Sequence, residues 1–93
     1  MAQYSLGEAI QQFLKQSRMK SDIQALQIEE LWEKLMGKTI ARYTDSIKIA
    51  NRTLFITTSV APLKQELLYQ KEKIKLRVNE ALGTNDIQEV VIQ

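Results

Sequence analysis

The sequence contains no cysteine and no histidine among its 93 residues. Without cysteine, the chain forms no disulfide and offers no thiolate nucleophile. Without histidine, it also lacks the commonest general base, and the two absences together remove the usual zinc ligands. The one carboxylate cluster, Glu29, Glu30 and Glu33, lies beside Lys34 on an expected helix, which is typical of a solvated face. We therefore predict a protein that is not an enzyme and that binds no metal, cofactor or small-molecule substrate.

Glycine, long apolar runs and excess charge are also scarce. The three glycines have no P-loop spacing, and no apolar run approaches the roughly 18 residues of a membrane span. The segment Met1–Gly7 has no charged region followed by an apolar stretch, so no secretory signal is expected. The net charge is only +2 and 44% of the residues are hydrophobic. These values predict one soluble domain, residues 1–93, in the cytoplasm and without a membrane partner.

The first half of the chain has helical spacing. Ser5 is an expected N-cap for a short amphipathic helix, Leu6–Ser17. The polar run Ser17–Ser21 is predicted to be a connector. A second helix is predicted over Asp22–Tyr43, with a break, a kink or a close approach to another backbone at Gly37. Its apolar stripe contains Ile23, Leu26, Leu31, Leu35 and Met36, and is widened by Ile28, Trp32 and Ile40.

The hydrophobic period then changes to two. The runs Ser46–Ala50 and Thr53–Thr57 alternate, and the two residues between them, Asn51 and Arg52, match the tightest hairpin loop. This loop sets Ile47 opposite Ile56, Lys48 opposite Phe55, and Ile49 opposite Leu54. A long helix, Val60–Leu82, and a strand, Ile87–Gln93, complete the order helix, helix, strand, strand, helix, strand. We predict a two-layer α+β fold with a three-stranded mixed sheet and helices on one face.

Several segments together resemble one protein family. They are Leu31–Ala41 with its tryptophan, glycine and isoleucine-alanine, then Tyr43-Thr44, Leu54–Ser59, Glu66-Leu67, Leu82-Gly83 and Ile87. This ordered set resembles the DciA-like family, and the opening Ser5–Ile10 is similar to short stand-alone members from Bacteroidota. The resemblance implies a KH-like fold and a non-enzymatic accessory protein that binds the replicative DNA helicase and assists its loading or activity. The chain has no GxxG loop, through which ordinary KH domains clamp single strands.

The candidate partner-binding residues lie on the first two predicted helices. Leu6, Ile10, Phe13 and Leu14 form an apolar stripe, and the helix that carries it is open to two interpretations. It is either the most mobile helix, able to dock in the groove of a partner, or a helix packed permanently on the core. Trp32 is open to two interpretations, a core anchor or an exposed hot spot. Lys34 and Lys38 flank it as a polar rim.

Two further groups are candidates for contact with single-stranded or forked DNA. Lys71, Lys73, Lys75 and Arg77 form the densest basic cluster, which either contacts phosphates or is a solvated helix surface. Lys48 and Phe55 form either a base-stacking platform or a shielded sheet face. Two other functions stay open: a single-stranded nucleic-acid binder without sequence preference, and a structural dimerisation module.

Overall fold

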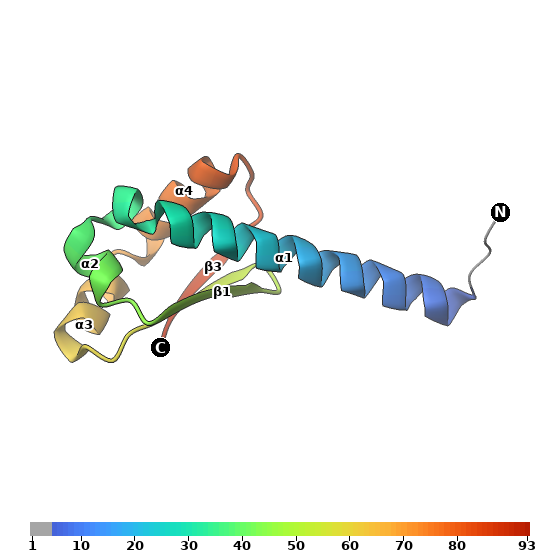
Figure 1. Cartoon of the computed structure of the whole chain (residues 1–93), viewed down its shortest axis with the longest axis horizontal. Coiled ribbons are helices and arrows are strands. Elements are labelled where there is room, and N and C mark those ends of the chain that lie inside the picture. Colours follow the sequence, from blue (N-terminus) through green and yellow to red (C-terminus); the bar gives the residue numbers. More distant parts are fainter. Residues whose placement is uncertain (1–4) are drawn as a thin grey trace.

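The computed structural model of the chain describes residues 5–93. Residues 1–4, which belong to the predicted domain and to the segment Met1–Gly7, lie outside the described part. Along the chain the elements are α1 (Leu6–Met36), α2 (Lys38–Arg42), β1 (Ser46–Ala50), β2 (Thr53–Thr57), α3 (Ala61–Tyr69), α4 (Lys71–Leu82) and β3 (Glu89–Ile92). The chain is therefore α+β, with the helices packed against a three-stranded mixed sheet (Figure 1).

The β1–β2 hairpin confirms the predicted register at every pair, including Lys48 opposite Phe55. Its two loop residues, Asn51 and Arg52, both have a positive φ, 51° and 61°. A two-residue type I′ loop has this left-handed conformation at both positions. Hairpins favour this loop because its backbone twist matches the twist of the two strands. Asn tolerates it readily, whereas Arg52 adopts it without the freedom of glycine.

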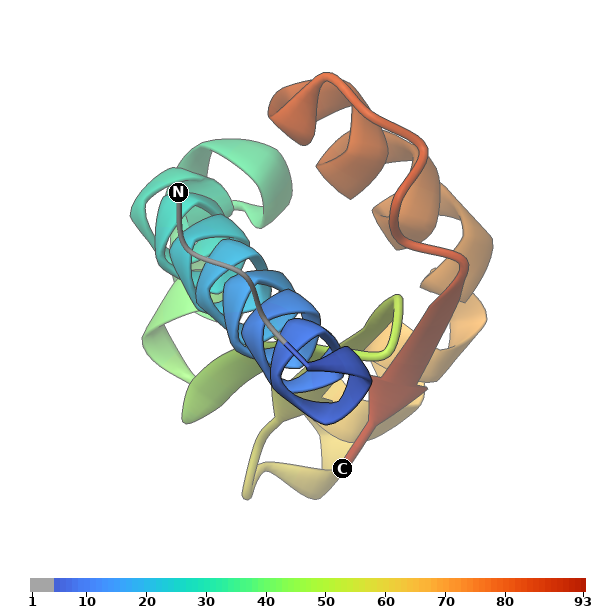
Figure 2. The same ribbon diagram turned by 90° about the vertical axis from the view of Figure 1, so that its right-hand side faces the viewer.

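Strand β3 pairs with β2 in parallel, so β2 is the central strand. A parallel return needs a crossover, and α3 and α4 provide it. The alternation of each strand gives the sheet one apolar face. That face carries Ile47, Ile49, Leu54, Ile56 and Val90, all buried. Helices α1 and α4 lie on the same side of the sheet (Figure 2) and bury this face. The side chains that they contribute to the core include Ile28 and Trp32 from α1 and Ile74 and Val78 from α4.

Two helices precede the hairpin, as predicted, but the predicted connector between them at Ser17–Ser21 is wrong. Helix α1 runs without interruption for 31 residues and is capped by the Ser5 side chain, which accepts a hydrogen bond from the Glu8 amide. The connector segment contains neither glycine nor proline, and its residues cost a helix interior only a few tenths of a kcal/mol each. Polarity alone therefore did not mark a helix end.

Two other helix boundaries depend on single residues. The expected break at Gly37 is confirmed, because its φ of 91° and ψ of 164° end α1 before the short α2 begins. The expected single helix Val60–Leu82 is wrong in detail, because Gln70 (φ −105°, ψ 12°) separates α3 from α4. One non-helical residue leaves the spacing of Leu67, Ile74 and Val78 in phase, so the hydrophobic period could not reveal it.

Candidate protein-binding surface

The N-terminal half of α1 projects beyond the rest of the molecule (Figure 1). Every residue from Leu6 to Lys20 is exposed, and the first buried residue of α1 is Gln24. We call residues 6–23 the overhang. At 1.5 Å per residue it is about 27 Å long, half of the 54 Å long axis of the molecule. Tertiary packing supports most helices of this length in water. In the overhang, residues 6–20 are all exposed, and Lys20 near its end forms an ion pair with Asp86.

The overhang carries an apolar stripe in line with the core-facing stripe of α1. Eighteen residues make about five turns of an α-helix, so residues eighteen apart lie on the same side. Ile10 is eighteen residues before Ile28, and Leu14 is eighteen before Trp32. The exposed members are Leu6 (79%), Ile10 (50%), Phe13 (66%) and Leu14 (59%). The side of α1 that builds the core thus continues, uncovered, past the end of the sheet.

A cleft of about 780 Å³ lies where the overhang meets the hairpin. Phe13 and Leu14 line it from α1, Ile49 lines it from β1, and Ile87 lines it from the segment before β3. Three cationic side chains also border it, those of Arg18, Lys20 and Arg52. The cleft therefore combines apolar walls with a mainly basic margin.

Asp86 is the acidic group of this margin, and it ties α1 to the segment before β3. Its Oδ2 accepts a hydrogen bond of 3.0 Å from the side-chain Nε2 of Gln24 and lies 3.1 Å from Lys20 Nζ. The hydrogen bond from Gln24, followed by that from Lys20, lowers the pKa of the Asp86 carboxyl below its ordinary value of 3.8. We call the rest of the molecule, residues 24–93, the body. The contacts of Asp86 hold α1 in place where the overhang leaves the body.

A second exposed apolar stripe lies on the opposite side of α1. Ile23 and Leu26, two members of the apolar stripe read from the sequence, are 53% and 60% exposed, and Met19 beside them is 57% exposed. The apolar residues of α1 fit two stripes, and only the one through Ile28 and Trp32 meets the sheet. The eighteen-residue spacing from Ile10 to Ile28 is the signal in the sequence that distinguishes them.

Trp32 is a core residue, the first of its two interpretations. Its side chain is 3% exposed, and its Nε1 donates a 3.0 Å hydrogen bond to Thr44 Oγ1. The Thr44 hydroxyl in turn donates to the Ile40 carbonyl oxygen. Trp32 therefore holds α2 against α1 and is not available on the surface to contact a partner, so its prediction as an exposed hot spot is wrong for this fold.

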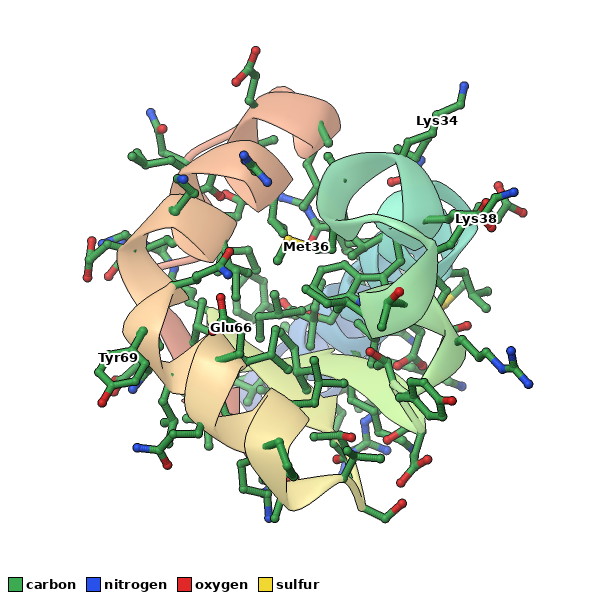
Figure 3. The ribbon with its side chains drawn as sticks, turned by 90° about the vertical axis from the view of Figure 1, so that its left-hand side faces the viewer. Lys34, Met36, Lys38, Glu66 and Tyr69 are labelled. Carbon is green, nitrogen blue, oxygen red and sulfur yellow. The ribbon has the colours of Figure 1, made fainter. Side chains whose placement is uncertain are left out.

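Lys34 and Lys38 are exposed at the other end of α1 and on α2. Figure 3 shows both side chains pointing outward, while Met36 points toward the space between α1 and α4. Lys34 lies about 30 Å along the helix axis from Leu14. The residues predicted to bind a partner therefore fall into two separate groups, one on the overhang and one at the opposite end.

The candidate DNA-binding residues are also divided. On α4, Lys73 is exposed, Lys75 pairs with Glu72 at 3.2 Å, and Arg77 donates a 2.9 Å hydrogen bond to the Leu35 carbonyl oxygen at the end of α1. Lys71 is half-buried on the side of Lys75. Lys48 and Phe55 lie on the sheet face opposite the helices. The structure does not bring the two groups together.

Among residues 5–93, no helix is both long enough and apolar enough to cross a bilayer. The same residues hold no group of three or more carboxylates close enough to chelate a metal ion.

Comparison with known proteins gives one positive result. No curated protein matches the chain, and no solved structure matches it either, so the expected similarity to KH domains stays a prediction. One family model, described as "Dna[CI] antecedent, DciA", matches residues 5–92. The family is associated with helicase loading in bacteria. Since the match covers nearly all of the sequence, the chain belongs to the DciA family.

Proposed function

We propose that this protein is a non-enzymatic, cytoplasmic accessory factor that binds the replicative DNA helicase and assists its loading or activity. Membership of the DciA family supports the choice of partner. The observation that carries the proposal is the overhang, whose apolar stripe of Leu6, Ile10, Phe13 and Leu14 is exposed although it continues the core-facing side of α1.

The overhang has the features of a helix that docks in a groove. Recognition of this kind uses apolar anchors on successive turns of one helix side, and Ile10, Phe13 and Leu14 have that spacing. Phe13 also lines the cleft against Ile49 and Ile87, so a partner segment seated there would contact the overhang and the body together. Large apolar side chains in such a position are the usual hot spots of an interface.

The two groups of candidate residues imply two contacts. Lys34 and Lys38 lie about 30 Å from the overhang stripe, so one small partner element does not reach both. We propose that the overhang is the main contact, and that Lys34 and Lys38 add a polar contact to a second part of the helicase. Trp32 acts only by positioning α2, which carries Lys38.

The test is a titration of the replicative helicase from the same bacterium against the purified chain. We expect Phe13→Asp to weaken binding by about 30-fold or more, the loss typical of a hot spot. Leu76→Asp is the matched control, because Leu76 is also 66% exposed but lies on α4. Amide hydrogen exchange adds a second measurement: Ile10–Leu14 should exchange rapidly in the free chain and slowly in the complex.

Equal affinities of the parent and Phe13→Asp, with Leu76→Asp also unchanged, would exclude the overhang as the contact. Protection of Ile10–Leu14 in the free chain as strong as that of Ile74–Val78 would exclude an uncovered overhang. A parent chain that does not bind the helicase at all would contradict the proposed partner itself.

A further inference from the structure

The charges of α1 are divided between its two halves. Residues 6–21 contain three cations (Lys15, Arg18 and Lys20) and one carboxylate, a net charge of +2. Residues 22–36 contain four carboxylates (Asp22, Glu29, Glu30 and Glu33) and one cation, a net charge of −3. Among these groups, in the part of the chain that the structure describes, only Lys20 forms an ion pair with the body.

This order of charge does not stabilise α1 through its own dipole. A helix favours carboxylates near its N-terminus and cations near its C-terminus. Glu8 and Lys34 follow this rule in the first and last turns, but the charge blocks between them have the opposite order. A second helix lying antiparallel to α1 would set each block against its opposite, whereas a parallel one would set like charges together.

An apolar seam joins the two charge blocks. Met19, Ile23 and Leu26 are spaced by four and three residues, the spacing of coiled-coil contact positions. The same spacing extends to Gln16 before them and to Glu30 and Glu33 after them. The seam lies on the side of α1 opposite Ile28 and the sheet, so a helix packed on it does not collide with the body.

We propose that two copies of the chain associate through α1, packed antiparallel along the Met19–Ile23–Leu26 seam. The two-fold axis passes beside residues 24 and 25, which sets Ile23 against Leu26 of the second copy. Lys15 then lies near Glu33 of the second copy, on the same side of the seam, and this ion pair occurs twice by symmetry. The apolar stripe of Leu6, Ile10, Phe13 and Leu14 stays exposed on the other side of each overhang. The dimer therefore presents two sites for a further partner.

The interface is small. Three apolar side chains per copy place it at the low end of specific interfaces, and we expect a dissociation constant of about 10–100 μM. The ion pairs are exposed, so raising the salt concentration should weaken the dimer. Association of this strength is visible by sedimentation equilibrium and is easily lost on dilution.

The first experiment measures the mass of the purified chain, without helicase, by sedimentation equilibrium from about 10 μM to about 1 mM, a range that spans the expected dissociation constant. We expect a monomer–dimer equilibrium. The double variant Ile23→Glu, Leu26→Glu should weaken association at least tenfold. The matched control is Leu68→Glu, Leu76→Glu, which adds the same charge at exposed apolar positions of α3 and α4. Circular dichroism checks folding, and Ile23→Gln, Leu26→Gln replaces the test variant if it unfolds.

The second experiment tests the orientation by cross-linking. Because the chain has no cysteine, Gln16→Cys and Glu33→Cys each introduce a single thiol. In the antiparallel dimer, residue 16 lies opposite residue 33 of the second copy, while the two copies of residue 16 are about 25 Å apart along the helix axis. A short bis-maleimide should therefore join a mixture of the two variants and leave each variant alone largely uncoupled.

Three outcomes would overturn the proposal. The first is a parent chain that stays monomeric at the highest concentration, even if the Ile23 and Leu26 variant loses helicase binding; the seam would then belong to the helicase. The second is a dimer that the Ile23 and Leu26 substitutions leave intact. The third is efficient coupling of Gln16→Cys to itself, which indicates parallel helices. None of these results depends on helicase binding by Phe13.

Discussion

Several residues that support the family resemblance act in the structure through their contacts with one another. Trp32 donates a hydrogen bond to Thr44, and Gly37 between them has the backbone angles that let α2 begin. Trp32 and Thr44 thus form one tie between α1 and the segment after α2. A buried polar atom that loses its partner costs more than the bond contributes, so this tie should be sensitive to small changes.

Trp32→Phe is expected to lower the free energy of unfolding by about 2 kcal/mol, from the lost indole hydrogen bond and the space that the smaller ring leaves. Thr44→Val removes the other partner at nearly the same volume. In urea titrations followed by circular dichroism, the double variant should lose about 1 kcal/mol less than the two single losses together. Additive losses would show that the hydrogen bond contributes nothing to stability.

Asp86 connects stability to pH. Because its pKa is lower in the folded chain than its ordinary value of 3.8, the ionised carboxylate stabilises the fold. This contribution is complete above that value and is lost as the pH falls through the lower pKa of the folded state. We expect Asp86→Asn to reduce the urea midpoint at about pH 7 and to match the parent near pH 2. Glu80→Gln, an exposed position on α4, is the control; a similar reduction in that variant would indicate net charge as the cause.

At the scale of the elements, two glycines at opposite ends of α1 allow a matched pair of substitutions: Gly7 in its first turn and Gly37 directly after its last residue. Gly37 has a φ of 91°, and Gly7 lies in the first turn of α1; an added Cβ would meet no atom within 4 Å at either position. An added methyl group therefore causes no clash at either glycine, and the two positions differ in the backbone conformation that alanine would have to adopt. Gly37→Ala should destabilise the chain by about 1–3 kcal/mol, whereas Gly7→Ala should raise the helical content of the overhang and improve stability by up to about 1 kcal/mol. Thermal melts measure both, and a loss at Gly7 would mean that the overhang is not helical in solution.

The same elements show how far the sequence predicts this structure. The hairpin register and the break at Gly37 could be predicted because a period of two and a left-handed position depend on few local residues. The continuity of α1 could not, because Ser17–Ser21 suits a connector and a helix equally well. The apolar side of α1 was also ambiguous, since Ile23 and Ile28 both fit a period of 3.6. Ile28 is buried because its stripe meets the sheet, and the eighteen-residue spacing from Ile10 to Ile28 is the sign of this in the sequence.

The candidate site divides in the same way. Leu6, Ile10 and Phe13 could be singled out because the apolar stripe of an amphipathic helix needs a cover. The cleft beside them could not be foreseen, because Ile49 and Ile87 are distant in sequence from Phe13 and line the same cleft only once the sheet has formed. The separation of Lys34 from the overhang follows from the uninterrupted helix, which the connector prediction had concealed.

At the scale of the whole molecule, charge limits what the chain does with DNA. A net charge of +2 predicts weak binding to single-stranded or forked DNA that falls steeply with salt, because phosphate contacts release counterions. On α4 the cations differ in kind: Arg77 holds the end of α1 through the Leu35 carbonyl and Lys75 pairs with Glu72, while Lys73 points to solvent. Reversal of Arg77 therefore tests folding as well as binding, and Lys73 is the position that tests binding alone.

We expect Lys73→Glu to reduce affinity for single-stranded DNA of any sequence by a similar factor and to lower the slope of log affinity against log salt by about one unit. Fluorescence anisotropy with labelled oligonucleotides at about 50 mM and about 200 mM salt measures both quantities. Lys38→Glu, an exposed lysine on α2, is the control for overall charge. Parent-like affinity of Lys73→Glu at low salt would mean that α4 only solvates the molecule. An equal loss in both variants would mean that DNA responds to the total charge of the chain, without a defined phosphate site on α4.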